Sequence, residues 1–207
     1  MQKIFAWVGL ASTVTLLPAL ALAGPGPADD AGAAMQRSFT ARGQAGMDRL
    51  DQDPVQKLCS RAPDDPALSD KDFEQILKSQ EASIRYPADG QYLGDWKEGE
   101  KIAQDGKGFQ YSDDPAQPAG GNCYACHQLA KGEVAYGTIG PSLYLYGKSR
   151  GNDAEAQRYT YGKIYNSNAY LPCSNMPRFG HNGILNEQQM KDVTAFLLDP
   201  QSPVNAE

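Results

Sequence analysis

The chain has 207 residues and a formal net charge of −6, from 25 acidic and 19 basic residues. A chain of this length can bury one hydrophobic core, and nothing in the composition requires a second. Lys and Arg form no cluster along the chain, so we exclude nucleic acid as a partner, because neutralising phosphates requires grouped cations. The acidic balance instead suits a basic protein partner.

The first residues have the pattern of a secretory signal peptide. Lys3 supplies a positive start, an apolar stretch runs from Ile4 to Leu22, and Ala21-Leu22-Ala23 has the small-x-small form of a cleavage site. A membrane anchor is the alternative, but polar residues and Pro18 interrupt the apolar stretch. We therefore predict a signal peptide over residues 1–23, export to the periplasm and no membrane span after cleavage.

Residues 24–91 are predicted to be an N-terminal extension. Its first part, residues 24–34, is expected to be a disordered leader. A helix is expected over residues 35–50, and Ser69 has the position of a cap for a second helix that runs to about Arg85. The extension is therefore expected to be helical after its leader and to pack on the rest of the chain or on another subunit.

The segment Cys123-Tyr124-Ala125-Cys126-His127 has the spacing of a c-type haem attachment motif. Two such thiols can bond the vinyl groups at one edge of haem, and the adjacent imidazole then reaches the iron. Half of a zinc site and a thioredoxin-like dithiol are the alternatives. Zinc would need more ligands, although His181 is the only other histidine, and a dithiol needs no following histidine. We predict one covalently bound haem c, with Cys123, Cys126 and His127 as its attachment and ligand residues.

The second iron ligand is sought among the methionines and the remaining histidine: Met35, Met47, Met176, Met190 and His181. Met176 is favoured, since Pro172 and Pro177 flank it and make a stiff loop. The other methionines have the pattern of packing residues, whereas His181 stays a competing ligand. A thioether ligand raises the reduction potential and fills the sixth position of the iron. Electron transfer is therefore the expected role, and no catalytic residue is assigned.

Two further expectations concern the surroundings of the haem. Gly140-Pro141 follows the motif, and we predict that a backbone carbonyl there accepts a hydrogen bond from the free ring nitrogen of His127. An ordinary turn is the alternative. Lys148, Arg150 and Arg158 are candidates for pairing with the haem propionates, although each could equally be a solvated surface charge.

Cys59 and Cys173 are the two cysteines outside the motif. In an oxidising compartment they are expected to form a disulfide, which would anchor the Met176 loop to the N-terminal extension. Two free thiols are the alternative.

Residues 92–207 have the plan of a small cytochrome c domain. Helices are expected over 96–104, from a cap at 151–153 toward Asn166, and after Asn186 until Pro200, and alternating strand patterns are scarce. The predicted fold class is therefore all-α, a cytochrome c-like domain with covalently bound haem and an N-terminal helical extension.

Four segments together resemble the SoxX family, the monohaem subunits of SoxAX cytochrome complexes. These segments are residues 121–127, 139–143, 172–180 and 184–205. The resemblance implies that Cys123, Cys126, His127 and Met176 are the haem attachment and axial positions. It also implies a heterodimer that oxidatively conjugates thiosulfate to a carrier-protein cysteine, an L-cysteine S-thiosulfotransferase type of activity.

The same resemblance implies three partners. The bond-forming site would belong to a SoxA-like cytochrome subunit, the substrate cysteine to a sulfur-carrier protein, and the electrons would leave to a small acceptor cytochrome. A free-standing periplasmic electron shuttle is the alternative function.

Overall fold

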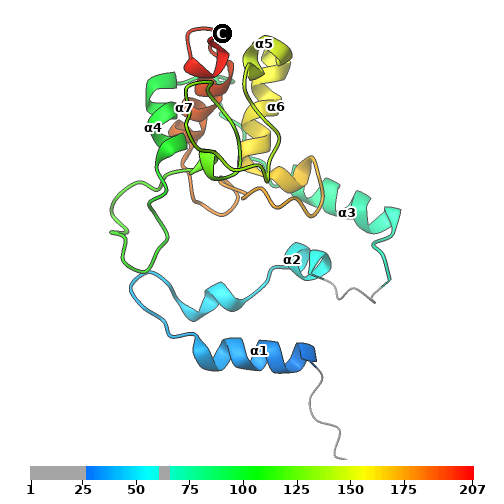
Figure 1. Ribbon diagram of the computed structural model, residues 1–207. Helices are drawn as coiled ribbons and strands as arrows, with labels where there is room; N and C mark the ends of the chain where they lie inside the picture. The colour runs from blue at the N-terminus through cyan, green and yellow to red at the C-terminus, as the bar shows by residue number, and fades with distance from the viewer. Residues whose placement is uncertain (1–26, 61–65) are drawn as a thin grey trace, which may run out of the picture. The chain divides into compact units, whose positions relative to one another are not determined.

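The computed structural model describes residues 27–60 and 66–207. In these ranges the chain forms helices, 3-10 turns and loops, and no β-strand (Figure 1). The predicted all-α fold class is confirmed. The predicted signal peptide, residues 1–23, lies outside the described residues. Within the described ranges, no helix is long and apolar enough to cross a membrane.

The chain divides into two compact units between Phe39 and Thr40. The first contains α1 (Pro27–Ser38), where a disordered leader was expected up to residue 34. Proline fits the first turn of a helix, and the following Ala-rich stretch has high helix propensity. Of the predicted helix over 35–50, only residues 35–38 are helical, as the end of α1. Farther along, Gly43 has a left-handed φ of 51°, which does not fit a helix, and only a short 3-10 turn, η1 (Met47–Leu50), follows.

After η1, which lies in the second unit, two capped helices follow, α2 (Pro54–Cys59) and α3 (Asp70–Glu81). Each starts with a capping box, in which the cap side chain and the side chain three residues on bond each other's backbone N–H. Asp53 and Gln56 form this pair in α2, and Ser69 caps α3 as predicted. Helix α3 ends at Glu81, short of the expected Arg85, and α2 was not predicted.

Helices α4 (Trp96–Gln104) and α7 (Glu187–Leu198) form the centre of the second unit, where they lie side by side (Figure 1). Both were predicted. They approach closely at Gly99, because a Cβ atom there would lie 2.1 Å from the backbone oxygen of Asp192. Phe196 is fully buried beside this crossing. The contact therefore depends on the absence of a side chain on α4.

The remaining elements are α5 (Tyr146–Arg150), α6 (Ala154–Tyr165) and the 3-10 turns η2 (Cys123–Ala125), η3 (Ser167–Ala169) and η4 (Pro203–Asn205). Helix α6 packs on α7, and η3 packs on α3. Asn205 links α5 to α7, since its Oδ1 accepts from the Gly147 N–H at 2.8 Å and its Nδ2 donates to the Leu197 carbonyl at 3.1 Å. Helices α5 and α6 and the turn η2 contribute residues to the wall of the candidate site.

Candidate functional site

A largely apolar cavity of about 560 Å³ lies in the second unit. Helices α4, α6 and α7 contribute Ala103, Ile164 and Phe196 to its wall, and the loops contribute Leu129 and Phe179. A cavity of this size and character is typical of a site for a cofactor rather than for water or a small ion.

The two motif cysteines lie in the wall of this cavity. The tight turn η2 brings them there, because the N–H groups of Cys126 and His127 both donate to the Cys123 carbonyl, at 3.1 and 2.9 Å. Asn122 enters the turn with a left-handed φ of 46°. Desolvation raises the pKa of the Cys123 thiol to about 12. A reactive dithiol requires a lowered thiol pKa, so this raised pKa disfavours the thioredoxin-like dithiol considered from the sequence.

His127 also lines the cavity, and a hydrogen bond to a backbone carbonyl orients its ring. Its Nδ1 lies 2.7 Å from the carbonyl oxygen of Pro141, which can only accept, so Nδ1 carries the proton. The carbonyl predicted from the Gly-Pro pair is therefore present. Gly140 lies against the ring, because a Cβ atom there would be 2.2 Å from Cε1 of His127. The remaining nitrogen, Nε2, is left with a lone pair for a metal.

Met176 lines the same cavity as His127. Hydrogen bonds fix its backbone: the Ser167 hydroxyl donates to the Met176 carbonyl at 2.6 Å, and the Met176 N–H donates to Ser174 Oγ at 3.2 Å. Ser174 is in turn held by Asn168, whose Oδ1 accepts from the Ser174 N–H at 2.9 Å. The thioether is therefore carried on a loop with a defined conformation.

The competing ligand candidates lie elsewhere. His181 is not among the residues of the cavity wall; its Nδ1 is 3.2 Å from the hydroxyl of Ser83. Met190 is buried in the core, and Met35 and Met47 are exposed. The geometry thus favours Met176 over His181 as the residue that can face His127 across the cavity.

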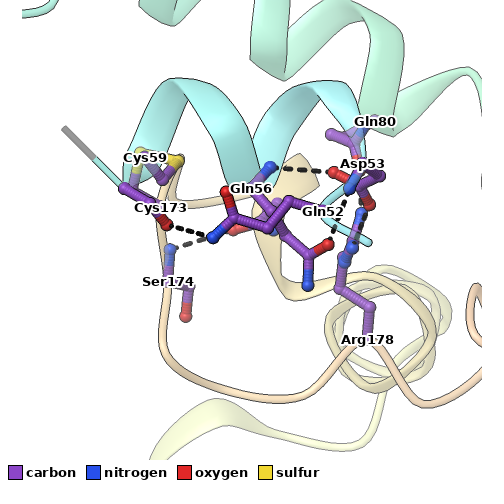
Figure 2. The surroundings of a disulfide bond; sticks show 10 residues. Gln52, Asp53, Gln56, Cys59, Gln80, Cys173, Ser174 and Arg178 are labelled. Atoms are coloured by element: carbon purple, nitrogen blue, oxygen red, sulfur yellow. Dashed lines mark hydrogen bonds and ion pairs between the residues drawn. A yellow bond between two sulfur atoms is a disulfide. The ribbon is translucent and has the colours of Figure 1, made fainter. Parts of the chain in front are cut away.

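Cys59 and Cys173 are joined by a disulfide, as expected from the sequence (Figure 2). It connects the end of α2 to the Met176 loop across 114 residues. In the chain-entropy model, closing a loop of this length stabilises the folded state by about 4 to 5 kcal/mol.

Charged side chains at the cavity wall are Arg150 and Lys163. Burial lowers the pKa of Lys163, so an anion bound nearby would stabilise its charged form. Arg150 was among the predicted propionate partners. Lys148 instead pairs with Glu207 at 2.8 Å, and Arg158 lies over the Tyr86 ring.

Sequence reasoning missed Lys163. Helical spacing could have found it, because it lies one turn after Tyr159 on α6, and both line the cavity.

As to the zinc alternative, the described ranges contain no group of three or more His, Cys, Asp or Glu that could hold a metal ion.

Comparison with known proteins agrees with this geometry. A family model described as cytochrome c matches residues 97–200. A protein of Aquifex aeolicus (strain VF5), described as an uncharacterized lipoprotein, is 42% identical over 156 residues, which are 74% of this chain and 73% of that protein. The matched range contains the haem motif, Met176 and the whole of α7. The chain belongs to the cytochrome c family of extracytoplasmic electron-transfer proteins, which carry covalently bound haem c.

Proposed function

We propose that this chain is the periplasmic monohaem electron-transfer subunit of a SoxAX-type complex that conjugates thiosulfate to a carrier-protein cysteine. One observation carries the haem assignment: Cys123, Cys126, His127 and Met176 all line a single apolar cavity. The first two would form the thioether bonds to one haem. His127 and Met176 would be its axial ligands.

The cavity residues fit this cofactor in charge as well as in shape. His127 offers Nε2 to iron because Pro141 holds Nδ1. The apolar walls exclude water from the macrocycle, and Arg150 and Lys163 would pair with its carboxylates. When bound, haem supplies a site that accepts and donates one electron at a time. If His127 and Met176 both held the iron, no position would be left open for oxygen or peroxide, so these residues favour electron transfer.

The proposed overall reaction removes two electrons. A carrier thiol and thiosulfate form an S–S bond, and the products are the S-thiosulfonate, one proton and two electrons. This bond would form in a SoxA-like partner subunit, which the resemblance of residues 121–127 and 172–180 to the SoxX family supports. The present chain would pass the electrons, one at a time, to a small acceptor cytochrome.

The test is affinity purification of the tagged chain from the native periplasm. We expect a second, SoxA-like cytochrome to co-purify, and the haem of the complex to be reduced when thiosulfate and carrier protein are both added. Purification as a monomer that thiosulfate does not reduce would contradict the complex and favour the free-standing shuttle.

The axial ligand is tested separately by spectroscopy. The ferric protein should show the weak charge-transfer band near the red end of the spectrum that reports a Met–iron bond. We expect Met176→Ala to abolish this band and His181→Ala to retain it. The opposite result would assign the sixth position to His181.

A further inference from the structure

The Met176 loop is fastened to the N-terminal extension at two points (Figure 2). One is the disulfide from Cys173 to Cys59. The other is an ion pair from Arg178 to Asp53, which begins the same helix α2 that Cys59 ends. Met176 lies between these two points in the chain. We call the set formed by Asp53, Cys59, Cys173 and Arg178 the extension clamp.

Of the two partners in this ion pair, Arg178 on the Met176 loop is the buried one. Arg178 is only 5% exposed, and its second guanidinium nitrogen, Nη1, donates to Gln80 Oε1 at 3.2 Å. The same Gln80 oxygen accepts from Asn166 Nδ2 at 3.0 Å. A buried guanidinium that loses its carboxylate partner keeps an uncompensated charge, which it can relieve only by moving toward water. Such a movement would carry the adjacent Met176 with it.

Asp53 has two roles that a substitution can separate. Its carboxylate accepts from the Gln56 N–H at 2.8 Å and so caps α2, in addition to its pairing with Arg178. Asparagine caps helices about as well as aspartate but carries no charge. Asp53→Asn therefore removes the ion pair while α2 keeps its cap.

We propose that Asp53 and Arg178, with the Cys59–Cys173 disulfide, are positioning residues that hold Met176 in the cavity, so that the N-terminal extension controls the sixth ligand position. This inference rests on the proposed role of Met176 as the iron ligand. It assigns a function to the extension: the extension determines how readily the loop opens and admits another ligand.

The experiment measures loop opening directly in the haem-loaded full chain. Imidazole can bind ferric iron only where Met176 has moved away, so its apparent affinity reports the open population. We expect Asp53→Asn, and separately Cys59→Ser/Cys173→Ser, to bind imidazole about tenfold or more tightly than wild type. The titration is done under native conditions, with circular dichroism to show that the helices are intact.

Asp153→Asn is the matched control. Asp153 caps α6 through the Ala156 N–H at 2.8 Å, and none of the ion pairs in the described ranges involves it. We expect wild-type imidazole affinity in this variant.

Two outcomes would overturn the clamp. One is unchanged imidazole affinity in Asp53→Asn, even with a lower unfolding midpoint, which is what a purely structural role produces. The other is an equal increase in affinity in both Asp→Asn variants. A wild-type protein without the Met–iron band would instead contradict the proposed ligand, so the two failures are distinguishable.

Discussion

The two walls of the cavity are built in different ways. The His127 wall is local: the contact that fixes the imidazole joins residues 14 positions apart. The Met176 wall combines local bonds from Ser167 and Ser174 with contacts from far along the chain. Gln80, Cys59 and Asp53 reach the loop over separations of 98, 114 and 125 residues. One wall can form from its own segment, whereas the full set of contacts on the other also requires residues 53–80 of the N-terminal extension to have packed.

This difference predicts which substitutions should affect each side of the site. Changes near His127 should act on haem binding directly and leave the rest of the chain intact. Changes in the extension should act at long range, first on stability and then on the Met176 side of the cavity. The following predictions test this division, in order of expected effect.

The largest effect is expected from removing the disulfide. Cys59→Ser/Cys173→Ser frees a closed loop across 114 residues, and we expect a loss of about 4 to 5 kcal/mol in the free energy of unfolding. For a chain of this size that corresponds to a fall of about 10 °C or more in the melting temperature. Urea unfolding followed by circular dichroism measures the loss. A loss below about 1 kcal/mol in the free energy of unfolding would show that the Asp53–Arg178 ion pair suffices to hold the loop.

A smaller and local effect is expected at Gly140. The added methyl group of Gly140→Ala would lie 2.5 Å from Nδ1 of His127, so the ring must move and its bond to Pro141 must weaken. We expect a cost of about 1 to 3 kcal/mol and a shifted Soret spectrum. Gly132→Ala is the control in the same loop, because a Cβ atom there meets nothing within 4 Å. Equal Soret spectra for Gly140→Ala and Gly132→Ala would show that the close approach of Gly140 does not position the His127 ring.

The sequence predicted the local wall well, but only part of the distant wall. Helix α7 and its Asn186 cap, the haem motif and the carbonyl behind His127 all depend on residues close together in the chain. The disulfide was expected because only two cysteines remained outside the motif. By contrast, no pattern indicates that Arg178 finds Asp53, since buried ion pairs between distant segments arise from packing.

Some local features were missed for identifiable reasons. Asp53-Pro54 is a normal start signal for a helix, yet α2 is short and carries little hydrophobic periodicity, so it was not predicted. Helix α5 begins after Leu145, which has a left-handed φ of 58° and provides no side-chain cap, so the sequence offers no start signal. The helix expected over 35–50 continues only to Ser38, and farther along at Gly43 a Cβ atom would lie 2.1 Å from the Tyr111 carbonyl oxygen.

The pH dependence of the distant wall gives a third prediction. Burial acts to raise the pKa of Asp53, but the Gln56 N–H and the Arg178 guanidinium together hold it below the usual 3.8. A carboxyl with a depressed folded pKa stabilises the protein above its unfolded pKa and loses that contribution as the pH falls through the folded value. We therefore expect stability to decline below about pH 3.8, and this decline to be smaller in Asp53→Asn. Equal acid profiles of unfolding in the two proteins would contradict the ion pair.

The smallest effect, and one of opposite sign, is expected inside the haem motif itself. Tyr124 is buried, its pKa is raised to about 12 mainly by burial, and its hydroxyl has no hydrogen-bond partner among the described residues, although Gln104 lies nearby. An unsatisfied buried hydroxyl costs free energy, so Tyr124→Phe should stabilise the protein by about 1 kcal/mol. Tyr92→Phe is the control, since the Tyr92 hydroxyl accepts from Arg158 Nη1 at 3.1 Å and its removal should destabilise by a similar amount. Urea unfolding of the two variants measures both signs, and a loss of stability in Tyr124→Phe would mean that this hydroxyl is hydrogen-bonded in solution.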